Sequence, residues 1–356
     1  MPAKIILNPY ANRWGAGKMA AGVAETLKGL GYAFDLVQTQ GPGDAVMLAR
    51  RAVREGYDPI VAAGGDGTIS EVVNGLLAEA DVAPVRLGLL PLGSANDYVV
   101  QLGVPLDVEA ACRNLVEARY ERVLDAGRVN DRVFMNDVNM AFGAQVNVEA
   151  ATIKRLRGSL IYLGGVFKAL RRYHLPRVTF AWDGGHLEDK PIVLAYVGIG
   201  WRTGGVFHLT PDALQDDGQL DFIYGDAMSR LQILRLLPKT FDGSHIHAPA
   251  VFSTRCTWLD VTSAEPMPVL ADGEIIYRDA RELHIRVLPG ALRVLTGPQP
   301  GERPWAKGRG GMLASEVDVD GSQRAEVAAR GGGVDNDAAG AGSARDAHAE
   351  LDGPIA

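Results

Sequence analysis

The segment Val61-Ala62-Ala63-Gly64-Gly65-Asp66-Gly67-Thr68-Ile69-Ser70-Glu71 joins a strand pattern to a helix pattern. The apolar run from Ile60 to Ala63 is typical of a buried strand. Because glycine has no Cβ, the backbone N–H groups that follow can close on a bulky anion. Thr68 and Glu71 have the spacing of a capping box, which predicts a helix that begins at Thr68. The N-terminus of such a helix favours phosphate.

Glycines in such a segment could also form an ordinary turn between a strand and a helix. Asp66 favours a ligand site instead. An acid among anion-binding amides has a clear role only beside a metal ion or a ligand rich in hydrogen-bond donors.

Residues 4–125 alternate strand and helix patterns at the spacing of βαβ units, which predicts a doubly wound parallel sheet covered by helices. The predicted strands are Lys4–Leu7, Ala33–Thr39, Ile60–Ala63, Arg86–Leu90 and Tyr120–Leu124. The predicted helices are Lys18–Leu30, Asp44–Glu55, Ile69–Leu77, Asn96–Leu102 and Val108–Ala118.

Four candidate segments follow predicted strands, at the sheet edge where such folds bind ligands. They are Asn8-Pro9-Tyr10, Thr39, the glycine segment and Pro91-Leu92-Gly93-Ser94-Ala95-Asn96-Asp97. Each one alone could be turn chemistry, because Asn, Pro, Gly and Asp are common turn formers. Four of them at one edge favour a binding site.

After Asp125 the strand patterns become shorter and alternating, as in an antiparallel β domain. The predicted strands are Val133–Val138, Arg177–Trp182, Val193–Ile199, Leu220–Tyr224, Thr254–Thr262, Val269–Ala271, Glu282–Val287 and Ala291–Thr296, with helices at Ala144–Arg155 and Leu160–Tyr173. The predicted domains are therefore 1–125 and 126–296, and the last strand could return to the first domain. Residues 297–356 are rich in Gly, Ala, Asp, Arg and Ser, which predicts a disordered tail.

The net charge, the cysteines and the apolar runs limit the classes of function that the protein can have. A net charge of −7 argues against a nucleic-acid partner. Cys112 and Cys256 have no metal or redox spacing, so reduced thiols in a cytoplasmic protein are expected. There is no signal-peptide pattern, and no apolar run approaches the roughly 20 residues that span a bilayer.

Gly64-Gly65-Asp66-Gly67-Thr68 resembles the signature of the diacylglycerol kinase catalytic family, and NAD kinases and phosphofructokinases carry similar sequences. The resemblance implies an ATP-type phosphoryl donor and a second domain built as a β-sandwich. Pro91 to Asp97 resembles a further nucleotide-binding element of the family, with Ser94 in place of its usual threonine. The nucleotide-binding residues that the resemblance implies are Asn8, Thr39, Gly64, Gly65, Asp66, Gly67, Thr68, Ile69, Ser70, Glu71, Ser94, Asn96 and Asp97.

Residues 211–221 carry four carboxylates within ten positions. Such a cluster is either solvated or gathered around a hard cation. The segment resembles the Asp-Asp-Gly-x-Leu-Asp element of the same family, which implies a structural Mg²⁺. The implied metal residues are the Asp217 side chain, the carbonyls of Leu214 and Gln219, and Asp216 and Asp125 in the surrounding network. A second Mg²⁺, carried by the nucleotide, is expected near Asp66.

Asp272-Gly273-Glu274 lies between apolar segments, where Asp-Gly is a standard hairpin turn. In the family, an Asp-Gly-Glu at this place supplies the general base that the acceptor alcohol needs. The resemblance favours Glu274 as the base and keeps Asp272 as the second choice.

The order of the three motifs favours a lipid kinase over an NAD kinase. We therefore expect an ATP- and Mg²⁺-dependent lipid kinase that meets its lipid substrate at the inner membrane face, with a homodimer as one option. The alternatives are an NAD kinase and a non-catalytic regulator of the same fold. The motifs leave the acceptor lipid open.

Overall fold

The computed structural model describes residues 1–79, 85–153 and 159–298. Nearly all of the predicted tail lies outside the described residues, and so does the end of the helix predicted at Ala144–Arg155. Within the described ranges, no helix combines the length and the apolar character that crossing a membrane requires.

The N-terminal part of the chain is a parallel sheet with helices, as its alternating patterns predict. In chain order it contains β1 Ala3–Leu7, α1 Gly15–Gly29, β2 Phe34–Gln38, α2 Asp44–Arg54, β3 Ile60–Gly64, α3 Asp66–Leu77, β4 Arg86–Pro91, α4 Asp97–Gln101 and α5 Val108–Glu117. The strands lie in the order β2-β1-β3-β4, and every adjacent pair is parallel. Their carboxyl ends therefore share one edge of the sheet.

The remaining strands form an antiparallel array, which confirms the predicted change of architecture. The elements are β5 Glu121–Val129, β6 Arg132–Phe134, β7 Asp137–Ala141, α6 Phe142–Ala151, α7 Ser159–Arg171, β8 Arg177–Trp182, β9 Gly185–Gly198, β10 Leu220–Asp226, α8 Arg230–Leu236, β11 Val251–Cys256, β12 Trp258–Ala271 and β13 Glu274–Leu295, with short 3₁₀ turns at Leu237–Thr240 and Ser244–His247. The main path runs β11-β10-β9-β7-β12-β13, and β8 pairs with β9 and β12. Val129, Phe180, Phe222 and other buried side chains of these strands share one apolar core.

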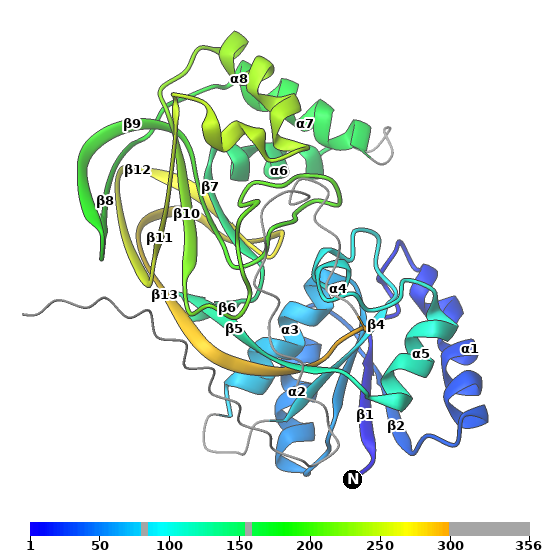
Figure 1. Ribbon diagram of the computed structural model, residues 1–356. Coiled ribbons are helices and arrows are strands. Elements are labelled where there is room, and N and C mark those ends of the chain that lie inside the picture. Colours follow the sequence, from blue (N-terminus) through cyan, green and yellow to red (C-terminus); the bar gives the residue numbers. More distant parts are fainter. Residues whose placement is uncertain (80–84, 154–158, 299–356) are drawn as a thin grey trace, which may run out of the picture. The chain divides into compact units, whose positions relative to one another are not determined.

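β13 belongs to both parts of the sheet, and Figure 1 shows it as a long orange strand. Its first two thirds pair antiparallel with β12, whereas Arg293 and Val294 pair parallel with Arg86 and Leu87 of β4. The prediction of a fifth parallel strand at Tyr120–Leu124 is wrong, because β5 runs antiparallel to β13. The two separate strands predicted at 282–287 and 291–296 are one strand with an irregularity between Leu288 and Leu292.

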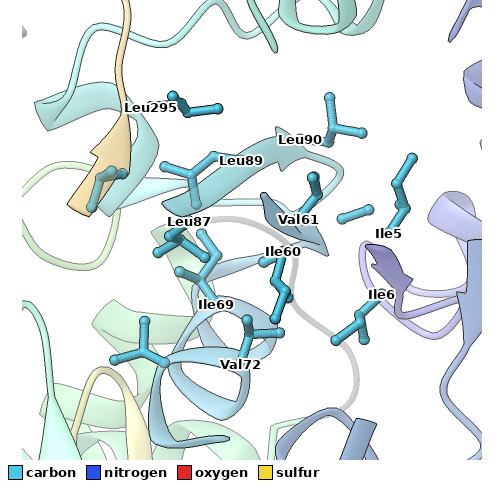
Figure 2. Close-up of a cluster of buried hydrophobic side chains, with 14 of the residues drawn as sticks. Ile5, Ile6, Ile60, Val61, Ile69, Val72, Leu87, Leu89, Leu90 and Leu295 are labelled. Carbon is cyan, nitrogen blue, oxygen red and sulfur yellow. The ribbon is translucent and has the colours of Figure 1, made fainter. Parts of the chain in front are cut away.

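Branched aliphatic side chains hold α3 against the parallel sheet (Figure 2). Ile60 of β3, Leu87 and Leu89 of β4, and Ile69 of α3 are at most 2% exposed. Burying such a side chain contributes about 1.5–3 kcal/mol. The same cluster that forms the core thus fixes the helix whose first turn follows the glycine segment.

Candidate active site

The glycine segment turns β3 directly into α3. Gly65 is extended, with φ −102° and ψ −173°, and α3 begins at Asp66. The prediction that the helix begins at Thr68 with a capping box is therefore wrong, since no side chain caps this helix. The Thr68 hydroxyl instead accepts a hydrogen bond from Asn8 Nδ2 at 3.0 Å, which ties the first turn to the end of β1. Thr68 and Ile69 donate their N–H groups to the Gly65 carbonyl, so in this turn the N–H groups of Asp66 and Gly67 remain available to an anion.

Glu71, the other half of the predicted capping box, supports a different helix. Its two carboxylate oxygens accept the N–H groups of Gly43 (2.9 Å) and Ala45 (3.1 Å) at the start of α2. A negative charge at this position stabilises the start of α2, because it interacts favourably with the helix dipole and with the N–H groups that have no partner within the helix. A nucleotide-binding role for Glu71 is thus still a prediction, and the side chain already has a structural one.

The segment Pro91 to Asp97 lies directly against the glycine segment. A Cβ placed on Gly93 would come within 2.3 Å of the Gly65 Cα, so only glycine permits this approach. The Asn96 side chain closes the turn by accepting from Gly93 N and donating to Gly93 O. Ser94 Oγ donates to Asn12 Oδ1 at 3.3 Å. The loops after β1, β3 and β4 therefore meet at one edge, as the sequence predicts.

Two acids reach this edge from different directions. Asp66 Oδ1 accepts the N–H of Tyr98, the second residue of α4, at 3.0 Å. Glu274, at the start of β13, holds Oε1 only 3.0 Å from where a Cβ would stand on Gly67. Glu274 follows Gly67 by 207 positions in the sequence, yet its carboxylate lies at the first turn of α3.

Next to Glu274 lies an open pocket of about 620 Å³. One wall of the pocket consists of Asn147, Ala150 and Ala151 of α6 and of Ile153, which follows that helix. The other wall consists of Gly273 and of Glu274, Ile275 and Arg278 in the first part of β13. Glu274 therefore stands between the glycine segment and a pocket that combines apolar and charged groups.

Asp272 and Gly273 form the hairpin turn that the sequence predicts, and Glu274, the next residue, lies beside the glycine segment. Asp272 and Gly273 have φ of +48° and +81°, as a two-residue hairpin turn requires. The Asp272 carboxylate accepts the N–H groups of Asn136 (2.9 Å), Met135 (3.2 Å) and Asp137 (3.3 Å). Because these amides donate to a carboxylate that is only 7% exposed, Asp272 anchors the hairpin, and its role as a second-choice base stays a prediction.

We expect Asp272→Ala to lower the free energy of unfolding by about 3–5 kcal/mol, because buried N–H groups would lose their acceptor. Asp272→Asn keeps one acceptor oxygen and should cost less than half of that. Urea unfolding of the two variants and the wild type measures the difference. Equal stability of the Ala variant and the wild type would contradict the anchoring role.

A buried polar network lies behind the turn, and the sequence analysis missed it. Gln101 Nε2 donates to Asn136 Oδ1 at 2.8 Å, and Gln101 Oε1 accepts the N–H of Trp201 at 2.7 Å. Asn136 Nδ2 donates to Asp137 Oδ2 at 3.0 Å. The only sequence signal was the polar pair Asn136-Asp137 inside the strand predicted at Val133–Val138.

The same network reaches Asp97, a predicted nucleotide-binding residue. Asp97 accepts the N–H of Gly205 at 3.0 Å and pairs with Arg202 Nε at 3.4 Å, and it is only 5% exposed. Burial, and then the charge of Asp66, raise the pKa of Asp97 to about 6. The carboxyl group of Asp97 thus joins α4 to the loop after β9, and contact with a nucleotide stays a prediction.

Burial also raises the pKa of Asp137 to about 7 and that of Asp272 to about 6. In an unfolded chain both groups titrate at about 3.9. Between those values the folded state binds more protons than the unfolded state, so these carboxyls make the free energy of unfolding fall as the pH rises. The buried His245, whose pKa burial lowers, acts with the opposite sign.

The difference between wild type and Asp137→Asn reports on Asp137 and on the charge of Asp272 that is coupled to it, because groups that do not interact with Asp137 cancel. We expect the Asn variant to gain stability relative to the wild type as the pH rises from 5 to 8. Urea unfolding at several pH values measures this trend. A difference that does not change with pH would show that Asp137 keeps an ordinary pKa.

Two carboxylate oxygens of the acidic segment 211–221 are buried and have no hydrogen-bond partner among the described residues, Asp217 Oδ2 and Asp221 Oδ2. Asp217 Oδ1 accepts the N–H of Gln219 at 3.0 Å. Asp217 Oδ2 is buried, has no hydrogen bond to any described residue, and lies 3.7 Å from Arg255, too far for a direct hydrogen bond. Burial raises the pKa of this carboxyl. A cation beside Oδ2 would satisfy an acceptor that the chain itself leaves open, so the site fits a hard metal ion.

The other predicted members of the metal network have protein partners. Asp125 accepts the N–H groups of Gly218 (2.7 Å) and Gly290 (2.8 Å), and so joins the acidic turn to the irregularity in β13. Asp216 pairs with Arg122 at 2.8 Å. Among the described residues no group of three or more His, Cys, Asp or Glu could hold a metal. An ion here would therefore depend on backbone carbonyls, such as those predicted at Leu214 and Gln219.

Two family models match the chain. The model described as the diacylglycerol kinase catalytic domain matches residues 2–129, and the YegS C-terminal NAD kinase beta sandwich-like domain matches residues 136–296.

Named relatives agree with these matches. A probable lipid kinase YegS-like of Chromohalobacter salexigens is 34% identical over 70% of this chain and 79% of its own length. A diacylglycerol kinase of Staphylococcus aureus is 30% identical over 76% of this chain and 85% of its own length. A solved diacylglycerol kinase structure from Bacillus anthracis covers 83% of this chain and 97% of its own, with a TM-score of 0.63 and 21% identity, and so shows the fold.

The protein is thus a kinase that has an alcohol group as its acceptor. More narrowly, the chain belongs to the diacylglycerol kinase catalytic-domain family, because the family model matches its N-terminal part and because the two named relatives are at least 30% identical over more than two thirds of their own length.

Proposed function

We propose that this protein is an ATP- and Mg²⁺-dependent lipid kinase that phosphorylates a lipid hydroxyl. The position of Glu274 carries the proposal, because its carboxylate lies at the first turn of α3 and also lines the adjoining pocket. A donor phosphate on the α3 amides and an acceptor in the pocket would then meet at one side chain.

In the proposed reaction the acceptor hydroxyl oxygen forms a bond to the γ-phosphorus of ATP. The bond between that phosphorus and the β,γ-bridging oxygen breaks, and ADP leaves. Glu274 takes the hydroxyl proton, as a general base does in alcohol phosphorylation. The amides at the start of α3 hold phosphate oxygens, and Asp66 lies beside them.

Two magnesium positions accompany this proposal. Mg²⁺ offsets phosphate charge when it is bound with the nucleotide, and Asp66 is the acid of the glycine segment that would hold it. The Asp217 side chain and the carbonyls of Leu214 and Gln219 would hold a second, structural ion. The unpartnered Asp217 Oδ2 supports that second position.

The pocket favours a lipid over a dinucleotide acceptor. Ala150, Ala151, Ile153 and Ile275 give it an apolar wall, which suits a glycerol backbone or an acyl chain better than a second nucleotide. A lipid substrate further implies that the protein works at a membrane surface.

The test is transfer of label from γ-labelled ATP, with Mg²⁺, to a total lipid extract and in parallel to NAD. We expect a labelled lipid and no labelled NADP. Label in NADP would make the protein an NAD kinase. Label in neither acceptor, with ATP binding intact, would point to a regulator without catalysis.

A further inference from the structure

The loop 201–207, which follows β9, brings an arginine from the antiparallel part of the chain to the first turn of α4. We infer that Arg202 is a positioning residue of the active site. It holds Asp97 and, through the first turn of α4, keeps Asp66 in place for the magnesium that the nucleotide brings. This inference rests on the proposed function, and it gives a role to a residue that belongs to none of the predicted motifs.

Arg202, Asp97 and Gly205 form a closed set of contacts. Arg202 Nε lies 3.4 Å from Asp97 Oδ1. It also donates to the Gly205 carbonyl at 3.1 Å, and Nη2 of the same side chain donates to that oxygen as well. The Gly205 N–H in turn donates to both carboxylate oxygens of Asp97, at 3.0 and 3.1 Å. Each of the three residues therefore contacts the other two, and the planar guanidinium fixes the place of the Asp97 carboxylate.

The loop that carries Arg202 is itself held at several points. Thr203 and Phe207 exchange two backbone hydrogen bonds, of 2.9 and 3.0 Å, and Gly204 between them has a φ of +59°. The Arg202 carbonyl accepts a hydrogen bond from Asn136 Nδ2 at 2.9 Å. The side chain of Arg202 is only 18% exposed. A mostly buried side chain on a fixed loop has few alternative positions, so it can determine where its partner lies.

Only one peptide bond separates Asp97 from the residue that contacts Asp66. Asp97 is the first residue of α4, and Tyr98, the second, donates its N–H to Asp66 Oδ1 at 3.0 Å. Because α4 is only five residues long, a shift of Asp97 moves Tyr98 with it. Arg202 therefore acts on Asp66 through the first turn of this short helix.

The charges of these side chains support the same role for Arg202. Burial, and then the charge of Asp66, raise the pKa of Asp97, whereas the charge of Arg202 lowers it. Asp66 and Asp97 thus repel each other, and Arg202 offsets this repulsion. Without Arg202, the carboxylate of Asp97 would be a buried charge held only by an amide, and the first turn of α4 would move away from Asp66.

The experiment uses the full-length protein and two measurements. Calorimetric titration with ATP, with and without Mg²⁺, gives the gain in ATP affinity that the metal brings, and it needs no acceptor. Phosphorylation of vesicles made from a total lipid extract gives kcat. The variants are Arg202→Gln, Arg202→Lys, Asp97→Asn and the double variant of Arg202→Gln with Asp97→Asn.

Arg86→Gln is the matched control. Arg86 is also partly buried, and it pairs with Asp58 at 2.9 Å. It lies at the start of β4, at the opposite end of that strand from the candidate site. Its loss should lower stability without moving Asp66. Urea unfolding of every variant measures the stability.

We expect Arg202→Gln to reduce the Mg²⁺-dependent gain in ATP affinity about 10-fold, and kcat about 10- to 100-fold, as for other residues that orient a metal-binding side chain. ATP affinity without Mg²⁺ should change less than about twofold. Arg202→Lys should keep part of the gain, since it retains the charge without the planar donors. The double variant should lie within about twofold of Asp97→Asn alone, because the arginine acts through that acid. Arg86→Gln should keep wild-type kcat and Mg²⁺ dependence.

Several outcomes would overturn the inference. Wild-type kcat and Mg²⁺ dependence in Arg202→Gln would show that Asp66 does not depend on Arg202. Losses that add in the double variant would show that Arg202 acts independently of Asp97. Equal losses in Arg202→Gln and Arg86→Gln would indicate a general effect on folding. A wild type whose ATP affinity is independent of Mg²⁺ would remove the metal role of Asp66 as well. A wild type that binds ATP with Mg²⁺ but labels no lipid would refute only the proposed function, and calorimetry would still decide the role of Arg202.

Discussion

Asp66→Asn should lower kcat about 10³-fold or more, while the protein remains folded and the Asn side chain still accepts the N–H of Tyr98. The expected loss of kcat comes from removing the negative charge of the Asp66 side chain. Asp66 is the acid of the glycine segment, and it lies beside amides that suit phosphate, where a magnesium-bound nucleotide would need it. Steady-state phosphorylation of lipid vesicles measures kcat, and calorimetric titration with ATP, with and without Mg²⁺, measures binding.

Calorimetry distinguishes the loss of the Asp66 charge from misfolding of the glycine segment. The wild type should bind ATP more tightly with Mg²⁺ than without it, and Asp66→Asn should lose that difference. Asp35→Asn is the matched control, because Asp35 lies at the start of β2 and contacts the Tyr57 hydroxyl, away from the carboxyl ends of the strands. Full activity of Asp66→Asn would remove Asp66 from the reaction.

Glu274→Gln should lower kcat about 10²- to 10⁴-fold, the usual contribution of a general base. Gln has the same size and keeps the contact with Gly67, but it cannot take the proton of the acceptor hydroxyl. The KM for ATP should change little, because the donor is held by α3 and its loop. The measurement is kcat and KM on the acceptor lipid that the labelling experiment identifies.

Asp279→Asn is the matched control for Glu274, since Asp279 is an exposed acid of the same strand and does not line the pocket. It should retain wild-type kcat. Wild-type kcat in Glu274→Gln would exclude Glu274 as the base and would favour Asp272, the second choice.

Local patterns were sufficient to predict much of the fold and the motif positions. The loops after β1, β3 and β4 are short-range features, and parallel pairing brings strand ends together without further information. Glu274 was predicted only because its motif resembles a known family. Its contact with Gly67 depends on the path of β13, for which no local pattern exists.

What the sequence analysis missed depends on tertiary contacts. Thr68 and Glu71 have the spacing of a capping box, but Asn8 and the amides of α2 provide alternative partners. Gln101 and Asn136 form a network only because the fold brings α4 beside the residue that precedes β7, and no spacing rule relates them.

The shared strand β13 has a consequence for biosynthesis. The glycine segment emerges early from the ribosome, whereas the strand that completes the parallel sheet beside β4, and that also carries Glu274, is translated some 200 residues later. Domains tend to fold in the order of their synthesis. The N-terminal parallel sheet is therefore synthesised first, and its β4 edge has no partner strand until β13 has been made. The protein can acquire activity only after β13 has been synthesised.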